Sequence, residues 1–300
     1  MTLIQCKYLI IDWGTTNFRA FAMSAEHQLL AMQEHPLGIL QVENAQFESA
    51  LKRVLEGWID DYSAVPVFMA GMIGSLKGWV NVPYATTPVD CTKLTEKAHQ
   101  FKLSWGANAV ILPGVCHQYE GDKYDVIRGE EIQALGLAKI MNSADYHAIL
   151  PGTHSKHLEF KGNTLYHFAS FLTGELYSVI SKHTLLGRDL PKALGDEAIF
   201  LKGVNEAQQG AFANRLFLAW THRLFQNLTA EQIPDYLSGL LIGFELRELD
   251  SQRVYIVGGD QLSKLYLQAS TALGIEATVV EGNECFLAGM SVLIEELLDD

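Results

Sequence analysis

The chain is short of basic residues and of long apolar runs. Its 300 residues include 22 Lys and Arg against 35 Asp and Glu, which gives a formal net charge of −13 at pH 7. This balance argues against a nucleic-acid partner, because a basic surface supplies most of the affinity for a phosphate backbone. It does not exclude small anionic substrates, since a few local cations can dominate a closed cleft. No apolar run reaches the roughly 18 residues that a membrane-spanning helix needs, so we expect no membrane partner.

Cysteines and targeting signals are also sparse. The four cysteines (Cys6, Cys91, Cys116 and Cys285) are scattered, and no two have the spacing of a metal-binding pair. The N-terminus lacks a basic segment followed by an apolar stretch and a small-residue cleavage site, so we expect no secretion signal. These features predict a cytoplasmic protein with reduced thiols. Apolar residues make up 48% of the chain and charged residues 19%, which is typical of a globular protein with a core.

Two common nucleotide-binding loops are absent. The sequence has no G-x-x-x-x-G-K-[ST], which excludes a P-loop, and the glycines near the N-terminus do not follow G-x-G-x-x-G. Instead, a predicted strand at 7–12 runs into Asp12, and a second strand at 18–23 follows and carries Arg19. Asp12 offers a hard oxygen ligand for Mg²⁺. The turn between the strands offers backbone N–H groups and hydroxyls to phosphate oxygens through Gly14, Thr15 and Thr16.

The second half of the chain repeats the pattern of the first. A third strand is predicted at 28–34, and in the second half a strand through Ala148–Leu150 leads into Gly152-Thr153-His154, with strands at 155–160 and 164–169. A duplicated three-stranded unit with a Gly-Thr turn predicts two similar lobes that face each other across a cleft. When the second Gly-Thr turn is aligned with the first, Leu150 lies opposite Asp12. The second turn therefore lacks an acidic residue at this position, and the general base must come from elsewhere.

The remaining segments alternate between strands and helices, which predicts an α/β fold. Apolar spacing predicts a helix over 43–62 and buried strands at 65–70 and 109–112. Helices at 129–141 and 285–297 carry small residues that allow a close crossing. A strand through Val254–Val257 ends in Gly258-Gly259, whose bare backbone lets a flat ring approach, and a helix follows from Leu262.

Taken in order, these segments resemble the actin-like ATPase superfamily of sugar kinases, Hsp70 and hexokinase. The resemblance implies a two-lobed α/β fold of the actin-like ATPase (ribonuclease H-like) type with a duplicated βββαβα core. It implies lobes at 1–130 and 131–284, with a connecting helix at 285–300. The two phosphate turns correspond to Asp12–Arg19 and Leu150–Lys156, and the two connecting helices to Gly129–Met141 and Cys285–Leu297. The adenosine Gly-Gly corresponds to Val257–Asp260.

Further motifs resemble the 2-dehydro-3-deoxygalactonokinase family over nearly the full length. They are Met69–Ser75, Gly78-Trp79, Arg128–Gln133, Pro151–Lys156, Leu172–Leu176 and Leu237–Gly243. The resemblance implies phosphorylation of the 6-hydroxyl of a six-carbon 2-keto-3-deoxy sugar acid, with ATP and Mg²⁺, in galactonate catabolism. An exopolyphosphatase-like or other actin-fold phosphotransferase, and a non-catalytic sugar-sensing regulator, are the alternatives. The residues do not fix the C4 stereochemistry of the sugar acid, and they leave the oligomeric state open, a homodimer included.

Within this framework each candidate residue has an expected role. The general base is expected at Glu130 or Glu131, with Glu175 in reserve and Asp12 as the metal ligand; the alternative for the two glutamates is to complement the helix dipole. A guanidinium binds a carboxylate bidentately, so Arg128 is the first choice for the carboxylate of the sugar acid, before Lys156 and Arg19. The loop at 71–84 is expected to pack on the sugar acid through Gly71, Ser75, Trp79 and Tyr84. The nucleotide is expected to contact Gly14, Thr15, Thr16, Gly152, Thr153, His154, Gly258 and Gly259.

Overall fold

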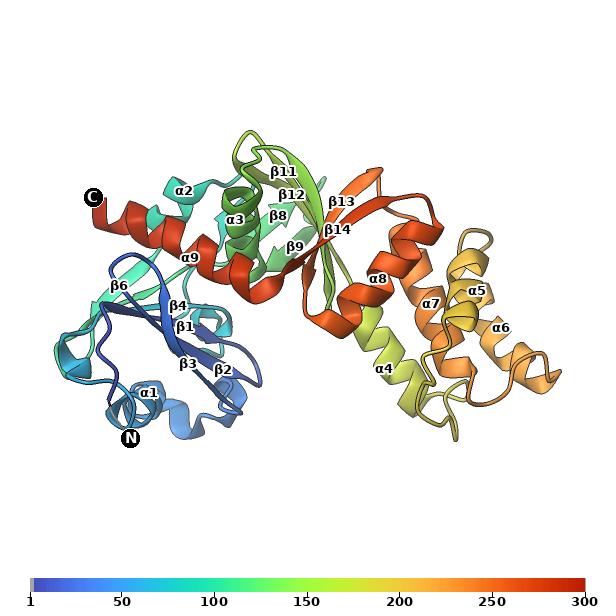
Figure 1. Cartoon of the computed structure of the whole chain (residues 1–300), viewed down its shortest axis with the longest axis horizontal. Helices are drawn as coiled ribbons and strands as arrows, with labels where there is room; N and C mark the ends of the chain where they lie inside the picture. The colour runs from blue at the N-terminus through green and yellow to red at the C-terminus, as the bar shows by residue number, and fades with distance from the viewer. Residues whose placement is uncertain (1–2, 300) are drawn as a thin grey trace. The chain divides into compact units, whose positions relative to one another are not determined.

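A computed structural model describes residues 3–299 and divides them into two compact units (Figure 1). Unit 1 contains the chain up to Ala144, residues 161–167 and the chain from Glu284 onward. Unit 2 contains Asp145–Phe160 and Phe168–Asn283. The lobe boundaries expected after residues 130 and 284 stay a prediction.

Unit 1 is built on a six-stranded sheet in the order β3-β2-β1-β4-β7-β6. Strand β1 pairs antiparallel with β2 and parallel with β4, which in turn pairs parallel with β7. Leu9, Ile11 and Trp13 of β1 are buried in a core that α1 covers with Phe47 and Leu51. The elements are β1 (Tyr8–Trp13), β2 (Phe18–Met23), β3 (Leu29–His35), β4 (Val67–Ala70), β6 (His99–Lys102), β7 (Asn108–Ile111) and α1 (Phe47–Glu56).

The helix expected over 43–62 is shorter than the apolar pattern suggests. Helix α1 ends at Glu56, and 3₁₀ turns lie on either side at Glu43–Ala45 and Tyr62–Ala64. Gly57 follows the helix, and glycine is a poor helix former. Trp58 and Ile59 are nevertheless buried, so the apolar stripe reports burial beyond the end of the helix.

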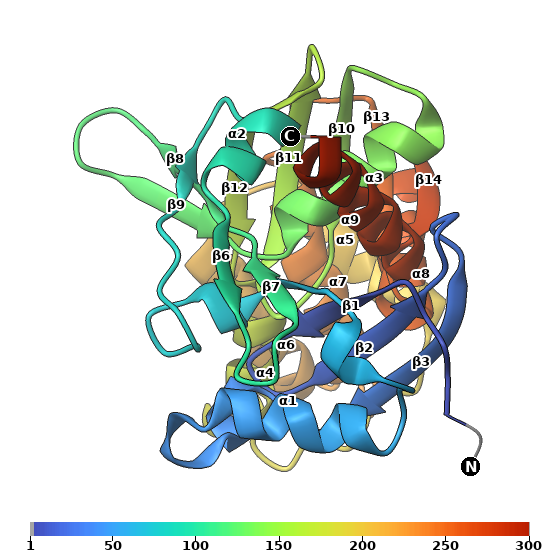
Figure 2. The same ribbon diagram turned by 90° about the vertical axis from the view of Figure 1, so that its left-hand side faces the viewer.

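A small three-stranded sheet, β5-β8-β9, completes unit 1 and was not expected from the sequence. It consists of β5 (Ala85–Thr86), β8 (Val115–Gln118) and β9 (Tyr124–Ile127), with α2 (Cys91–Glu96) following β5 in the chain. Strands β8 and β9 form an antiparallel hairpin, visible at one side of unit 1 in Figure 2. Because β5 follows Tyr84 and β9 precedes Arg128, this sheet holds both residues in place.

Two helices of unit 1 cross at small residues, as predicted. They are α3 (Glu130–Met141) and α9 (Gly282–Asp299). A Cβ atom on Gly136 would lie 1.7 Å from the carbonyl oxygen of Cys285, and one on Gly289 would lie 1.9 Å from that of Ile132. The crossing therefore requires glycine at both positions.

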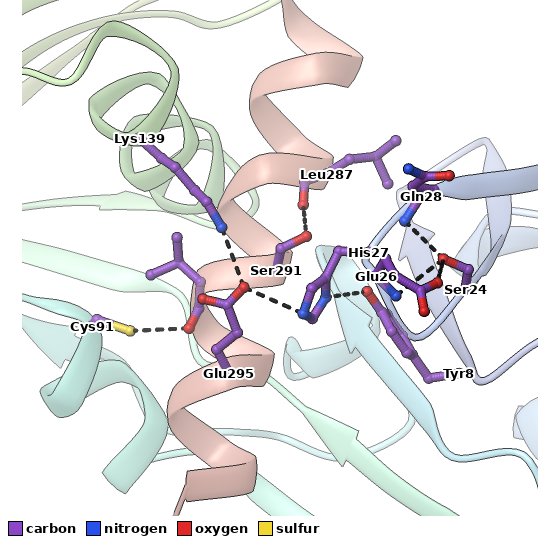
Figure 3. A network of polar contacts seen from close by, with 11 residues as sticks. Tyr8, Ser24, Glu26, His27, Gln28, Cys91, Lys139, Leu287, Ser291 and Glu295 are labelled. Atoms are coloured by element: carbon purple, nitrogen blue, oxygen red, sulfur yellow. Dashed lines mark hydrogen bonds and ion pairs between the residues drawn. The ribbon is translucent and has the colours of Figure 1, made fainter.

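A polar network fastens α9 to its neighbours in unit 1 (Figure 3). Glu295 accepts a hydrogen bond from Lys139 Nζ of α3 at 3.4 Å and lies 3.3 Å from His27 Nε2. The other ring nitrogen of His27 lies 2.6 Å from the Tyr8 hydroxyl of β1. One carboxylate thus links the first sheet and both crossing helices.

The second sheet has the order β12-β11-β10-β13-β14, which matches β3-β2-β1-β4-β7 of the first. Strand β10 pairs antiparallel with β11 and parallel with β13, as β1 does with β2 and β4. The predicted internal repeat is therefore confirmed. The strands are β10 (Tyr146–Leu150), β11 (Ser155–Lys161), β12 (Thr164–Phe171), β13 (Arg253–Gly258) and β14 (Glu276–Glu281).

Helix α7 is the centre of the helical part of unit 2 (Figure 1). It is buried along almost its whole length and packs against four other helices. A Cβ atom on Gly239 of α7 would lie 1.9 Å from the carbonyl oxygen of Phe200, so α5 and α7 meet backbone to backbone. The helices are α4 (Thr173–His183), α5 (Glu197–Glu206), α6 (Phe212–Leu224), α7 (Ile233–Leu246) and α8 (Asp260–Ala272). Within residues 3–299, no helix is both long and apolar enough to cross a membrane.

Candidate functional site

The first Gly-Thr turn joins β1 to β2 and presents two exposed threonines. Gly14 N donates to Asn17 O at 2.9 Å, which closes the turn, and Thr15 and Thr16 lie at its exposed tip. Gly38 supports the turn from behind: its N–H donates to Thr16 O at 3.0 Å, and a Cβ atom there would lie 2.3 Å from the carbonyl carbon of Thr15. The role of Gly38 was not predicted from the sequence, because it depends on a contact with a turn more than twenty residues away.

Asp12 and Arg19 face each other across the β1–β2 pair. Both Nε, at 3.1 Å, and Nη2 of Arg19 donate to Asp12 Oδ2. The other carboxylate oxygen, Oδ1, lies 3.1 Å from the position of a Cβ atom on Gly71. Gly71 has φ +91°, so glycine both permits this backbone and leaves room beside Asp12.

The guanidinium of Arg128 has two buried nitrogens and is only partly satisfied. Its Nη2 donates to Val82 O at 3.0 Å, and the group lies 4.5 Å from the centre of the Tyr84 ring. Among the described residues, Nε and Nη1 have no hydrogen-bond acceptor. Gly74 and Gly114 make space for the side chain, since Cβ atoms there would lie 2.7 Å from Nη1 and 3.1 Å from Arg128 Cβ. Buried N–H groups without acceptors are costly and uncommon in folded proteins.

Glu130 and Glu131 both cap the start of α3. Glu130 Oε2 accepts from Arg128 N at 3.0 Å, and both oxygens of Glu131 accept from Gly129 N at 2.8 Å. Glu130 is half-buried, whereas Glu131 is 1% exposed. Burial, with a smaller contribution from Glu130, raises the pKa of Glu131 to about 8. The glutamates thus differ in exposure, although both complement the N-terminus of the helix.

The other residues expected to bind the sugar acid lie in a loop that includes a 3₁₀ turn at Met72–Gly74. The Ser75 hydroxyl is buried and donates to Met72 O at 2.7 Å. Trp79 packs into the core of unit 1, stacked on Phe47 and edge-on to Phe101. The structure therefore brings Tyr84 to Arg128 but directs Trp79 toward the aromatic core.

In unit 2 the second Gly-Thr turn packs against the start of α4. A Cβ atom on Gly174 would lie 2.4 Å from Gly152 O, and Glu175 N donates to Thr153 O at 2.9 Å. The side chains of His154 and Glu175 are half-exposed and pair at 2.5 Å between Nε2 and Oε2. The Leu172–Leu176 motif thus has a structural role, because its Gly-Glu pair packs against the second turn and donates a hydrogen bond to it.

Lys156 and Glu245 lie behind the second turn. Lys156 is 4% exposed, and its Nζ donates to His154 O at 2.9 Å. Glu245 is buried and receives hydrogen bonds from Ser155 and Tyr266, both at 2.6 Å, and from Thr173. Glu245 was not predicted from the sequence, although an acid among the apolar residues near the end of α7 was a signal for it.

A cavity of about 210 Å³ opens in unit 2 beside the second turn. Its wall includes Gly152 of the turn, Gly174 of α4 and Tyr266 of α8. Asp235, also in the wall, accepts from the backbone N–H groups of residues 194–196 and so fixes that loop to α7.

The expected adenosine Gly-Gly lies where β13 passes into α8. A Cβ atom on Gly258 would lie 3.1 Å from Ser263 Oγ and 3.6 Å from Pro151 Cδ, so glycine lets β13 approach both α8 and the second turn. Nothing within 4 Å would meet a Cβ atom on Gly259. Gly259 therefore has open space above its backbone.

Among the described residues, no group of three or more His, Cys, Asp or Glu side chains is arranged to hold a metal ion. His154 and His157, which are close in sequence, have different partners, Glu175 and Glu245. A cation at Asp12 would therefore need ligands from outside the protein, such as phosphate oxygens and water, which Mg²⁺ commonly accepts.

Comparison with known proteins gives matches over nearly the whole chain. A model of the family described as 2-keto-3-deoxy-galactonokinase matches residues 12–293. The 2-dehydro-3-deoxygalactonokinase of Escherichia coli (strain K12) is 32% identical over 293 residues, which cover 96% of this chain and 97% of that protein. A probable 2-dehydro-3-deoxygalactonokinase, DgoK1, of Rhizobium meliloti (strain 1021) is 29% identical over 297 residues, with 95% of each chain covered.

A solved structure agrees with these matches. The crystal structure of a Sinorhizobium meliloti protein to which the same activity is attributed superposes with a TM-score of 0.90 and 27% identity, over 97% of this chain and 99% of that one. Together with the repeated strand order, this confirms the predicted α/β fold of the actin-like ATPase type.

The raised pKa of Glu131 predicts a pH-dependent stability. Between the ordinary pKa of 4.5 and the folded-state pKa of about 8, Glu131 keeps its proton in the folded chain but loses it in the unfolded chain. The stabilisation that comes from the protonated Glu131 is therefore complete below the ordinary pKa and is lost as the pH rises through the pKa of the folded state. Glu131→Gln cannot ionise, so its Tm should rise relative to that of the wild type between about pH 5 and pH 9. Thermal unfolding across this range, with the exposed Glu248→Gln as control, measures the effect; a pH-independent difference would contradict it.

Proposed function

The chain belongs to the 2-keto-3-deoxy-galactonokinase family, and from this premise we propose that it phosphorylates 2-dehydro-3-deoxy-D-galactonate with ATP. The 6-hydroxyl oxygen forms a bond to the γ-phosphorus, and the bond from that phosphorus to the β,γ-bridging oxygen breaks. ADP leaves, and the hydroxyl proton passes to a base. Phosphoryl transfer of this kind needs positioning and neutralisation of charge more than covalent help from the protein.

The observation that carries this proposal is that two of the three guanidinium nitrogens of Arg128 lack hydrogen-bond acceptors among residues 3–299. A sugar acid differs from a neutral sugar by its carboxylate, and two N–H donors of one guanidinium match two carboxylate oxygens. Nε and Nη1 are buried and lack acceptors among residues 3–299, while Nη2 is already bound to Val82 O. Tyr84 fixes the plane of the group from one face. A bound carboxylate would satisfy one of these donors and reduce the cost of its burial, since Nε and Nη1 lie on different edges of the guanidinium and Nη2 completes each edge.

The adenosine part of the nucleotide is proposed to bind to unit 2, and the Gly-Thr turn of each unit is proposed as a phosphate-binding element. The exposed Thr15, Thr16, Thr153 and His154 offer donors to phosphate oxygens. The open backbone at Gly258-Gly259 and the cavity beside Gly152 support a site for the adenosine part. Lys156 supports the second turn by its hydrogen bond to His154 O.

Asp12 is the proposed Mg²⁺ ligand. Its Oδ1 lies beside the bare backbone of Gly71, and its Oδ2 is held by Arg19, so the carboxylate has a fixed direction. A Mg²⁺ ion bound there would neutralise phosphate charge. Arg19 orients Asp12 and lowers the repulsion between this carboxylate and the phosphates.

Glu130 is the proposed general base. It is the more exposed of the two glutamates at the start of α3, and it follows Arg128 by two positions. Glu131, which is buried and bonded to Gly129 N through both oxygens, holds the start of the helix. A carboxylate within reach of the attacking hydroxyl takes its proton as the phosphoryl group moves.

The proposed partners are ATP, Mg²⁺ and the sugar acid, in the cytoplasm. The acidic charge of the chain supports a small-molecule substrate over a nucleic acid or a polyphosphate chain, because long polyanions need a basic channel. The match of the family model to residues 12–293 favours the sugar-acid kinase over the exopolyphosphatase-like enzyme and the sugar-sensing regulator.

Turnover with defined substrates tests the proposed function. ADP release from Mg-ATP should require 2-dehydro-3-deoxy-D-galactonate and should be weaker or absent with the gluconate epimer and with polyphosphate. A coupled ADP assay measures all three. ADP release that does not depend on the sugar acid would refute the kinase assignment and leave the fold unaffected.

Arg128→Lys should weaken binding of the sugar acid specifically. Lysine keeps the charge but loses the planar pair of donors, so the KM for the sugar acid should rise about 10- to 100-fold. The KM for ATP should stay unchanged. Arg53→Lys, an exposed change on α1, is the matched control. If Arg128→Lys alters the KM for ATP and not that for the sugar acid, the guanidinium serves a phosphate.

Glu130→Gln should lower kcat on the order of 100-fold and leave both KM values nearly unchanged. Glutamine can still accept the Arg128 N–H bond, so the start of α3 is preserved while the base is removed. Steady-state kinetics of Glu130→Gln and Glu131→Gln side by side distinguish the candidates. Loss of kcat in Glu131→Gln alone would reverse the two roles.

A further inference from the structure

Glu245 is a buried carboxylate on which four side chains converge. Its side chain is 1% exposed and lies near the C-terminal end of α7. Oε1 accepts from Ser155 Oγ at 2.6 Å and lies 3.0 Å from His157 Nε2. Oε2 accepts from the Tyr266 hydroxyl at 2.6 Å and from Thr173 Oγ1. A buried carboxylate is tolerated when its lone pairs are used in this way.

The donors come from the elements that shape the nucleotide side of unit 2. Ser155 directly follows His154 of the second turn, and Thr173 opens α4, whose Gly174 packs on Gly152. Thr173 and Tyr266 both line the 210 Å³ cavity. Oε1 therefore holds the strand that leaves the turn, and Oε2 holds two hydroxyl groups of the cavity wall.

We propose that Glu245 is a positioning residue that sets the second phosphate turn and the cavity wall in one geometry for ATP. The inference rests on the proposed kinase function. Glu245 touches neither substrate in this proposal and acts through the side chains around it, among them Ser155, Thr173 and Tyr266. Because burial and Glu245 keep the pKa of Tyr266 far above its ordinary value, the phenol remains a donor throughout the working pH range.

A general loss of stability is the competing explanation, and unit 2 offers a matched control for it. Tyr236 of α7 is buried, and its hydroxyl donates to Glu206 at 2.5 Å. Tyr266→Phe and Tyr236→Phe thus remove the same kind of bond from the same unit. Tyr236 does not line the cavity. Comparable Tm losses in both variants, with an effect on nucleotide affinity in one only, would separate positioning from stability.

The first measurement is the Kd of a non-hydrolysable ATP analogue by calorimetry, together with steady-state kinetics. Tyr266→Phe and Thr173→Val should each raise the Kd and the KM for ATP about ten-fold, since each removes a hydrogen bond to a charged group. The KM for the sugar acid should stay unchanged. Tyr236→Phe should leave nucleotide affinity unchanged. Equal effects of Tyr266→Phe and Tyr236→Phe on the Kd would overturn the proposal.

Glu245→Gln completes a double-mutant cycle with Tyr266→Phe. If the phenol acts through Glu245, the double variant should lose less binding free energy, calculated from the Kd, than the sum of the losses in the two single variants. Additive losses would contradict the proposal. The cycle is read from Kd values, so it remains decisive if the protein binds nucleotide but lacks sugar-acid turnover. That result would overturn the kinase assignment alone. A wild-type protein that binds no ATP analogue would overturn both.

Discussion

The proposed nucleotide side of unit 2 depends on one buried carboxylate. Glu245 has almost no contact with solvent, and removing a carboxylate from water is favourable only when donors surround it. Those donors come from β11, α4 and α8, so satisfying one carboxylate forces three elements that are distant in sequence to meet. The second turn and the cavity wall follow from that meeting. The exposed Thr153 and His154 thereby rest on a rigid support.

Arg128 in unit 1 is the opposite case. It lies against the Tyr84 ring with two buried nitrogens that have no acceptor among the described residues. The proposed carboxylate ligand would account for part of this burial cost. Glu245 and Arg128 therefore differ in how far their hydrogen-bonding groups are satisfied within the protein. Asp12 lies between these cases, with one oxygen held by Arg19 and the other beside Gly71.

The sequence was informative wherever structure follows from local pattern. The duplicated strands, the glycine-rich crossing of α3 and α9, and the Gly-Gly at the end of β13 depend on spacing and residue size, which are readable along the chain. The extent of α1 was wrong because buried residues continue past the helix end. Glu245 was missed because its meaning lies in hydroxyls up to 90 positions away. The direction of the Trp79 side chain, which packs between Phe47 and Phe101, also could not be predicted from local sequence pattern.

The absence of an acid at Leu150 has a consequence for how specificity and chemistry are linked. With no carboxylate on the second turn, the proposed base lies at the start of α3, two residues from the proposed carboxylate ligand. The sugar acid carries its carboxylate and its 6-hydroxyl at opposite ends, so the two protein groups must diverge. They do: the Arg128 guanidinium extends to Val82 and Tyr84, whereas the Glu130 carboxylate turns back to the Arg128 amide. One junction between β9 and α3 thus sets both positions. A substrate without a carboxylate would lose its alignment with the base as well as affinity, because binding at one end fixes the reacting atom at the other.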